Sequence, residues 1–293
     1  MNKLILTLAI SIILAASSAK SAERKIIKQH LDWVGCGITK KAFMRPLSES
    51  YAKKTGIKIR VVDGSSSEGI RLVKSMAADM GGACRHKLRG NEEEKGVRLV
   101  PIAWDALAII SNKNNPVKNI SLGQLRAVFE GRLTHWSQLG GADHPIKLLM
   151  RNDKASGVGH SLRHLLFKDE NKEILAKRSV SSSGSLESMV ESMPFALAVS
   201  GFSKANRHNV NIMQLEGYMP SYNSIQDGSY PLHIPLYITL NVYSENVAEV
   251  KQFINFALGH EGRAVIRGAG AVPYFEALAL IRKTGPQRMG KIL

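Results

Sequence analysis

One stretch of the sequence decides the fold: WDALAIISNKNNPVKNISLGQLRAVFEGRLTHWSQLGGADHPIKLLMRNDKASG, residues 104–157. Apolar runs predict strands over 97–102, 106–111 and 147–150, and the pattern between them predicts a helix over 121–131. Ser121 and Gln124 match a capping box, in which each side chain bonds the backbone of the other residue at the helix start. The same alternation of strands and helices continues along most of the chain. It favours a layered α/β fold.

The strand over 147–150 runs into Arg151, and Ser156-Gly157 follows at the start of another predicted helix. Helix N-termini carry unpaired N–H groups and partial positive charge. A guanidinium group can grip two oxygens of an oxyanion in a planar fork. Together these features predict a socket for a tetrahedral oxyanion. The alternative for Arg151 is a salt bridge, for instance to Asp153.

Two further helix starts share this logic. Thr39 precedes an amphipathic helix that contains Phe43, and Ser66-Ser67 precede the helix that contains Ile70. Any one of these hydroxyls alone is most simply an N-cap. Three helix starts together with Arg151 predict an anion site assembled from several parts of the chain.

Asp79 lies in a run of small residues, 78–85, which we expect to be a loop. A carboxylate beside an anion is favourable only when the anion carries a proton to donate, as hydrogen phosphate does. Facing sulfate, it would leave two acceptors unpaired. The alternative is that Asp79 simply forms a turn.

The first 22 residues match a cleavable signal peptide, with Lys3, an apolar run over 4–16 and small residues after it. The run is shorter than the roughly 20 residues that a membrane span needs, although an uncleaved anchor is the alternative. We therefore expect a periplasmic mature protein. The net charge of +16 comes from scattered basic residues with only 6% aromatics, so a nucleic-acid partner is not expected.

The chain has two cysteines, Cys36 and Cys84. In an exported protein such a pair is compatible with a disulfide, and two free thiols are the alternative. The nine histidines and the two cysteines show no metal-ligand spacing. No glycine-rich nucleotide fingerprint is present either. We therefore expect neither a metal nor a cofactor.

Three segments carry a family resemblance: FEGRLTHWSQLGG at 129–141 with Arg151 and Ser156-Gly157 after it, YPLHIPLY at 230–237, and FINFALGHEG at 253–262. Together they resemble the periplasmic phosphate-binding proteins of phosphate ABC transporters over nearly the whole mature chain. The resemblance implies a two-lobed type II periplasmic-binding-protein fold with the ligand cleft between lobes. We expect lobe 1 to contain 23–110 plus 235–293 and lobe 2 to contain 111–234, with crossings within 103–112 and 232–240.

The resemblance also implies a function without catalysis. A monomer would capture inorganic phosphate, or a similar tetrahedral oxyanion, and deliver it to an ABC permease. By motif match, the implied ligand-binding residues are Thr39, Ser66, Ser67, Asp79, Arg151, Ser156 and Gly157. If both lobe-1 loops reach the cleft, Cys36 and Cys84 would lie close enough to form a bridge.

Four departures from the family pattern concern the ligand. Val158 stands where the family has a threonine, and Glu68 stands where glycine is common. Lys40-Lys41 replace small or aromatic residues, and the spacing from Arg151 to Ser156 is one residue longer. These changes bear on which anion binds and how tightly, and they leave the predicted fold unchanged.

Two alternatives remain at this level. One is an exported phosphate-binding or adhesive protein that serves no transporter. The other is a serine enzyme of the penicillin-recognising type, because Ser50 with Lys53, SYN at 221–223 and KTG at 283–285 occur in that order. Their contexts disfavour the enzyme, since Ser50 and Lys53 fall at the end of a predicted helix.

Overall fold

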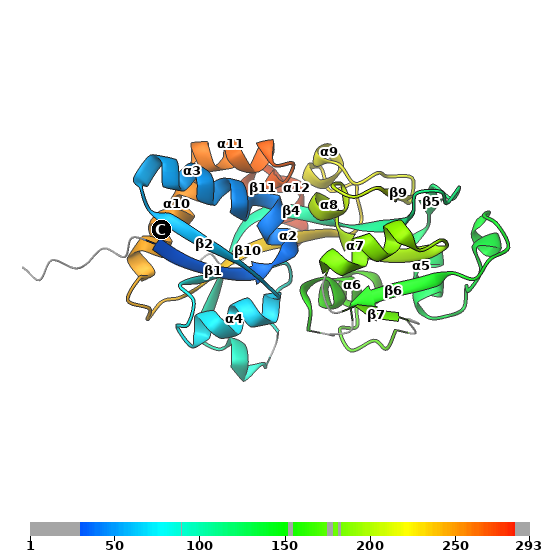
Figure 1. Ribbon diagram of the computed structural model, residues 1–293, viewed down its shortest axis with the longest axis horizontal. Coiled ribbons are helices and arrows are strands. Elements are labelled where there is room, and N and C mark those ends of the chain that lie inside the picture. The colour runs from blue at the N-terminus through cyan, green and yellow to red at the C-terminus, as the bar shows by residue number, and fades with distance from the viewer. Residues whose placement is uncertain (1–29, 89, 152–154, 175–177, 181–182, 285–293) are drawn as a thin grey trace, which may run out of the picture.

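The computed structural model describes residues 30–88, 90–151, 155–174, 178–180 and 183–284. The predicted signal peptide, residues 1–22, lies outside this range. Two lobes lie side by side and are joined by the long strands β4 (Val97–Asn112) and β10 (His233–Asn241) (Figure 1). Within the described residues, no helix combines the length and apolar character that a membrane crossing requires.

The first lobe is a mixed sheet with helices on both faces. Across it the strands run in the order β2 (Lys58–Gly64), β1 (His30–Cys36), β3 (Met80–Ala83), β10 and β4. One face is covered by α3 (Arg45–Thr55), α10 (Val247–Leu258) and α11 (His260–Gly268), and the other by α4 (Ser66–Lys74) (Figure 1). Because β1 and β3 are parallel neighbours, their carboxyl ends reach the same edge of the sheet.

The second lobe has a smaller sheet on the other half of β4. Its strands are β8 (Ala196–Gly201), β6 (Lys147–Arg151), β7 (Arg178–Val180), β9 (Val210–Leu215) and β5 (Asn119–Ile120). Its helices are α5 (Leu122–Phe129), α6 (Gly157–Phe167), α7 (Ser183–Ser192), α8 (Phe202–Ala205) and α9 (Tyr222–Gln226). The predicted capping box is confirmed, since Ser121 Oγ accepts from the N–H of Gln124 at 3.0 Å and Gln124 Oε1 accepts from that of Ser121 at 2.9 Å.

The two strands predicted at 97–102 and 106–111 form one continuous strand, β4, so the prediction of a break between them is wrong. The strand is buried along most of its length because it runs through both sheets. It changes partner midway: Ala106 pairs with His233 of β10, and Leu107 pairs with Gly201 of β8. We propose the lobe boundary at this change of partner, a few residues before the boundary expected at 110.

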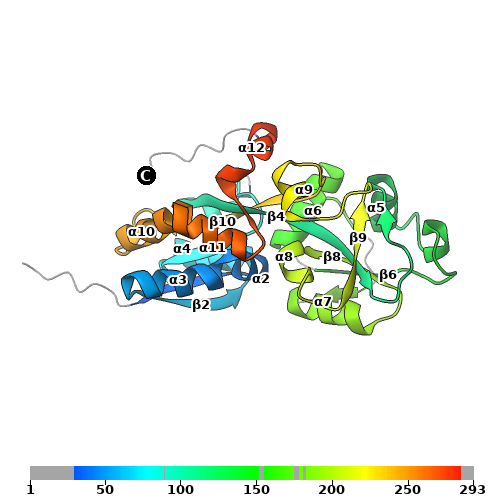
Figure 2. The same ribbon diagram turned by 90° about the horizontal axis from the view of Figure 1, so that it is seen from above.

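The end of the described chain returns to the junction of the lobes. The short strand β11 (Val272–Pro273) pairs with β4, and η4 (Tyr274–Glu276) and α12 (Leu278–Thr284) follow it. Lys283 Nζ donates to the carbonyl oxygen of Gly228 at 2.9 Å, which ties α12 to the segment after α9. Figure 2 shows α12 standing apart from α10 and α11.

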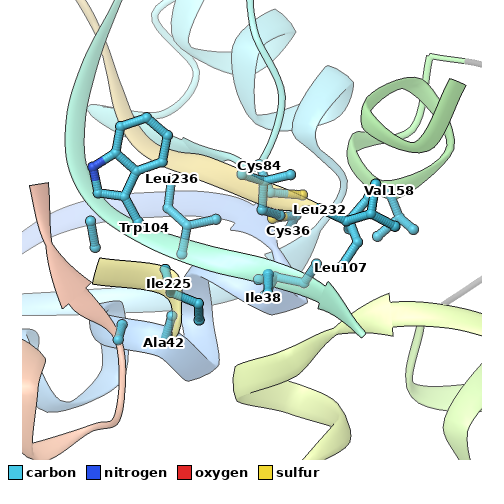
Figure 3. Close-up of a cluster of buried hydrophobic side chains, with 14 of the residues drawn as sticks. Cys36, Ile38, Ala42, Cys84, Trp104, Leu107, Val158, Ile225, Leu232 and Leu236 are labelled. Atoms are coloured by element: carbon cyan, nitrogen blue, oxygen red, sulfur yellow. The ribbon is translucent and has the colours of Figure 1, made fainter. Parts of the chain in front are cut away.

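The apolar core continues across the contact between the lobes, here called the seam. Figure 3 shows Ile38 of the first lobe beside Leu107 and Val158, close to the thiols of Cys36 and Cys84. A Cβ added at Gly201, at the end of β8, would lie 2.5 Å from Cδ1 of Ile38. The lobes are therefore closed on each other in this structure, with side chains of each packed into the other.

Candidate functional site

Two parallel strands of the first lobe place the cysteines together. Gly35 of β1 lies opposite Gly82 of β3, so Cys36 and Cys84 both leave the sheet at the same edge. Both thiols are buried and unbridged. They line a cavity of about 10 Å³, here called the thiol cavity, together with Ile38, Ser65, Ser66, Gly157 and Val158. This volume matches the space that one water molecule needs.

Three helix starts converge on the thiol cavity. Cys36 is the N-cap of a helix that runs through α2 (Gly37–Thr39), the π-helical turn η1 (Lys40–Met44) and α3. Ser65 caps α4, and Ser156 caps α6, where its Oγ accepts from the N–H of Gly159 at 3.1 Å. Since each helix start carries partial positive charge, the cavity favours a negative group.

The cap of α4 explains one departure from the family pattern. Ser65 Oγ accepts from the N–H of Glu68 at 3.1 Å, and Glu68 Oε2 accepts from the N–H of Ser65 at 3.3 Å. Glu68 thus completes a capping box and also adds negative charge to the first turn of the helix. Its role here is to stabilise the start of α4.

The structure brings the predicted hydroxyls Thr39 and Ser66 to the thiols. Thr39 Oγ1 donates to the carbonyl oxygen of Cys36 at 2.8 Å and lies 3.4 Å from Cys36 Sγ. Ser66 Oγ accepts from the N–H of Cys84 at 3.2 Å and lies 3.7 Å from Cys84 Sγ. Both hydroxyls therefore border the place where the lobes meet.

Gly157 reaches the thiol cavity from the second lobe. A Cβ added there would lie 2.2 Å from Cys84 Sγ and 2.6 Å from Ser66 Oγ. No real Cβ approaches other atoms so closely, so the start of α6 can reach the first lobe only because residue 157 is glycine. Val158 follows it and adds an apolar wall to the thiol cavity.

Ser67 joins the lobes and does not line the thiol cavity. Its Oγ donates to the carbonyl oxygen of Ala155 in the second lobe at 3.0 Å. It faces a wider cavity of about 370 Å³ that also carries Glu68, Glu93 and Glu94. Arg71 lines the same cavity and Glu94 is paired with Arg85, so its three carboxylates are partly balanced by cations.

Asp79 is not brought to the thiol cavity, contrary to its predicted role. Its carboxylate accepts from the N–H of Asp32 and from the side-chain amide of Asn246, each at 2.7 Å. The expected loop over 78–85 contains the strand β3, which separates Asp79 from Cys84 by roughly 16 Å at the usual rise per residue. The residue that reaches the cavity from this segment is Cys84, which sequence reasoning did not assign a direct ligand role.

Arg151 ends β6, where it pairs with Val180 of β7. Its side chain and Asp153 lie outside the described part of the chain, so its grip on an oxyanion stays a prediction.

Two other cations lie near the site. Lys204 Nζ is 3.4 Å from Glu187 Oε2 and 3.5 Å from the position that a Cβ on Gly37 would take.

Arg85 is fully buried and holds the lobes together. Its Nε donates to the carbonyl oxygen of Ala155 at 2.9 Å, and its NH2 group donates to Ser67 Oγ at 3.0 Å and to Glu94 Oε1 at 2.6 Å. Sequence reasoning missed this residue, because nothing local distinguishes it from the other basic side chains.

The two thiols differ in acidity. Burial alone raises the pKa of Cys36, but hydrogen bonds from the Cys84 thiol and from Thr39 outweigh it and lower that pKa to about 6. The hydrogen bond to Cys36, followed by burial, raises the pKa of Cys84 well above its usual value. Of the two, Cys36 is therefore the more acidic thiol.

A second cavity of about 70 Å³, here called the histidine cavity, lies on the same seam. It is lined by His86 of the first lobe, His160 and His164 of α6, and His233 at the start of β10. Burial lowers the pKa of His86 to about 4, and it lowers the pKa of His160 and His233 as well. In the part of the chain that the structure describes, no three side chains are arranged to hold a metal ion.

The motifs that suggested a serine enzyme lie on separate elements of the fold. Ser50 and Lys53 lie near the end of α3, and Ser221 caps α9, where its Oγ accepts from the N–H of Ser224 at 3.1 Å. Lys283 is on α12. Thr284 is the last described residue of KTG, since Gly285 lies beyond the described range.

Comparison with known proteins gives one consistent picture. A profile described as the PBP superfamily domain matches residues 36–261. The phosphate-binding protein PstS of Bacillus subtilis is 23% identical over 241 residues, which cover 78% of this chain and 77% of that protein. The crystal structure of a putative phosphate ABC transporter substrate-binding protein with bound phosphate from Clostridium perfringens superposes with a TM-score of 0.74 at 25% identity, covering 83% of this chain and 99% of that one. An ABC-type phosphate transport receptor from Vibrio cholerae has a TM-score of 0.63 at 25% identity, with coverage of 83% and 99%.

Proposed function

The chain belongs to the PBP superfamily, and on that premise we propose that it is an exported solute-binding protein for inorganic phosphate or a similar tetrahedral oxyanion. Delivery of the anion to an ABC permease is part of the proposal. It is supported by the names of the relatives, which are phosphate-binding proteins of transporters. The protein binds and releases its ligand and catalyses no reaction on it.

The observation that carries the proposal is the meeting of three helix N-termini at the thiol cavity. Two come from the first lobe, at Cys36 and Ser65, and one comes from the second lobe, at Ser156. Backbone N–H groups at helix starts are the donors that phosphate sites in proteins commonly use. Donors that arrive from both lobes also couple binding to closure.

We assign the ligand contacts to Thr39, Ser66, Ser156 and Gly157, with Arg151 supplying the charged fork. Thr39 and Ser66 would turn their hydroxyls from their present partners toward the anion. Thr39 now donates to the carbonyl oxygen of Cys36, and Ser66 accepts from the N–H of Cys84. Both partners belong to the first lobe, so turning these hydroxyls needs no movement between the lobes. Ser67 contributes by bonding the second lobe at Ala155.

Binding requires the lobes to separate first. A cavity of about 10 Å³ admits one water molecule and excludes a five-atom oxyanion. The strands β4 and β10 are the connections that can bend, since β4 changes its partner between Ala106 and Leu107. Reclosure then brings the start of α6 back onto the anion, and the cavity left around it is wider than the one described here.

Calorimetry with phosphate, sulfate, arsenate and molybdate tests the ligand assignment. The protein should start after residue 22, and the titrations should be run both with and without a thiol reductant. We expect heat with phosphate and arsenate, which share shape and protonation. Absence of heat with all four anions in both conditions would overturn the proposal.

Substitutions separate ligand residues from residues that act only on the fold. Ser66→Ala should weaken phosphate binding, whereas Ser221→Ala, which removes the cap of a helix away from the seam, should leave affinity unchanged. Asp79→Asn should leave the ratio of phosphate to sulfate affinity unchanged, because Asp79 faces Asp32 and Asn246. A collapse of that ratio would restore Asp79 to the ligand set.

Export is tested on the natural chain. Sequencing of the mature N-terminus should show cleavage within or just after the small residues at 17–22. A mature protein that retains Met1 would contradict the cleavable signal.

A further inference from the structure

The thiol cavity contains a cysteine pair that the anion-binding role does not require. Cys36 follows Gly35 on β1, and Cys84 lies two residues beyond Gly82 on the neighbouring parallel strand β3. With strands about 4.8 Å apart and one residue of offset, the two Cα atoms are about 6 Å apart. This separation lies within the range that a disulfide spans without backbone movement. Figure 3 shows the two side chains next to each other.

The surroundings of the pair favour one charged sulfur. Cys36 stands at a helix start, and Thr39 Oγ1 lies 3.4 Å from its Sγ. The Cys84 thiol donates to Cys36, which is how the lowered pKa of Cys36 arises. A thiolate at a helix N-terminus is also the reactive form of cysteine. The helix start and the Thr39 hydroxyl therefore favour a negative charge on Cys36 of the reduced protein, among the helix starts that an incoming anion would use.

Closure of the lobes controls access to the pair. Cys84 is 1% exposed, and the start of α6 covers it, since a Cβ on Gly157 would lie 2.2 Å from its Sγ. Ile38 and Val158 cover the remaining side of the cavity. Both cysteines belong to the first lobe, so a bridge between them leaves the movement of the second lobe free. Oxidation can thus occur in the open form without locking it.

We propose that Cys36 and Cys84 form a redox switch on the anion site, in which the reduced pair weakens anion binding and the disulfide restores it. The proposal rests on the proposed function, because it concerns the affinity of that same site. Oxidation removes the negative charge of Cys36 from the cavity. It also joins the two sulfurs, so that neither can donate or accept as a thiol or thiolate beside the start of α6.

The chemistry needs an oxidant of the disulfide class, either oxidised glutathione or the disulfide of a thiol oxidase. Cys36 thiolate attacks one sulfur of the oxidant, forms a mixed disulfide and releases one thiolate. Cys84 then loses its proton and attacks Cys36 Sγ, which releases the second thiolate. One leaving thiolate takes up the proton that Cys84 releases, and the other takes a proton from solvent, which received it when Cys36 ionised. The protein thus loses two electrons and the oxidant becomes two thiols.

The experiment uses the unsubstituted protein in two redox states at pH 8. Oxidised glutathione is added in phosphate-free buffer, and the excess reagent is then removed. The intact mass of the protein is measured before and after reduction. We expect the oxidised protein to be about 2 Da lighter, as loss of two hydrogens requires. Phosphate titration should then give at least about tenfold tighter binding for the oxidised form, a difference of about 1.4 kcal/mol.

The variant Cys36→Ser/Cys84→Ser is the matched control, because it keeps two small polar side chains but can form neither thiolate nor bridge. Its affinity for phosphate should be the same with and without the oxidant. Equal affinity of the two redox forms of the unsubstituted protein would overturn the switch alone. Two free thiols after treatment would do the same. Absence of phosphate binding in every form would instead overturn the proposed function together with the switch.

Discussion

The thiol cavity and the histidine cavity lie on the same seam and are both lined by residues of the two lobes, yet their chemistry is opposite. Around the thiol cavity, positive charge comes from helix starts, and the titrating group, Cys36, is an acid whose pKa is lowered. Around the histidine cavity the titrating groups are bases that burial keeps neutral. Backbone dipoles do not change with pH, whereas imidazoles do.

This difference assigns separate roles to the two regions. The thiol cavity has donors suited to an anion and only hydroxyls, thiols and apolar groups as side chains. The histidine cavity has no comparable set of helix starts, but its imidazoles come from both lobes and would repel each other when charged. Ligand binding should therefore depend on the thiol cavity. The pH dependence of the stability of the closed form should depend on the histidine cavity.

The largest effect should come from the polar link beside the thiol cavity. Arg85→Met leaves Glu94 buried without its partner, since the Arg85–Glu94 pair is almost completely shielded from solvent. Removing one partner of such a pair costs about 3–5 kcal/mol of the free energy of unfolding. Urea denaturation measures this loss. Arg85→Met combined with Glu94→Met should recover much of it, and a double variant as unstable as the single one would contradict the argument.

The histidine cavity should make the folded protein sensitive to acid. The pKa of His86 is about 4 in the folded state, because of burial and of repulsion from His164 and His160, which outweigh the attraction of Glu170. An unfolded chain protonates histidine near pH 6.5. The unfolded state therefore binds more protons between these values, and up to about 3 kcal/mol of stability is lost as the pH falls from about 6.5 to about 4.

Denaturation at a series of pH values measures this effect. His86→Gln keeps a side chain that can bond Tyr237, whose Oη lies 2.8 Å from His86 Nδ1, and removes the titration. Its stability should fall less steeply across the same interval. Identical slopes for the two proteins would show that His86 is not the group responsible.

Closure over the thiol cavity should fail when Gly157 gains a methyl group. Gly157→Ala places a carbon 2.2 Å from Cys84 Sγ, and such overpacking costs about 1–3 kcal/mol. Because reclosure over the anion brings the start of α6 back toward the same loops, phosphate affinity should fall about 10- to 100-fold. Gly123→Ala on α5, where the nearest atom would be 3.7 Å away, should leave affinity unchanged. Equal affinities for both variants would contradict the close contact.

The smallest effect should come from a single hydrogen bond between the lobes. Ser161 Oγ on α6 donates to the carbonyl oxygen of Cys84 at 3.0 Å. Ser161→Ala should weaken phosphate binding by about 1 kcal/mol, the usual net value of one such bond. Ser137→Ala removes an exposed bond to Asp143 in the second lobe and is the control. Calorimetry that shows no difference between the two would mean that this bond is already absent when ligand binds.

Several parts of the fold were predictable because neighbours in sequence determine them. The helix α5 follows from Ser121 and Gln124, which bond each other across one turn. The short 3-10 helix η3 (Trp136–Leu139) follows from Trp136 and from Gly140, which ends it with a φ of 82° that is costly for other residues. The strand β6 follows from its apolar run. The overall architecture came from resemblance, which the family match supports.

Other parts were missed for a physical reason. The strand β3 is short and consists largely of glycine and alanine, so its local pattern indicates a loop, and only pairing with β1 and β10 makes it a strand. This one misreading placed Asp79 at the ligand and left Cys84 without a ligand role. The Arg85–Glu94 pair was also invisible, because nothing in the local pattern predicts which charges become buried.

The sequence by itself therefore determined where these helices start to within a few residues and which hydroxyls stand near the starts, since these depend on contacts within about one turn. Two of the capping residues differ from the prediction, because Cys36 and Ser65 cap the helices in place of Thr39 and Ser66. The tertiary structure alone decided which of those starts meet. It set Cys36 beside Cys84 and brought Gly157 into contact with Cys84 and Ser66. It also placed Asp79 at the end of β3 away from Cys84. Strand pairing and lobe closure are long-range contacts, and no local pattern in the chain specifies their partners.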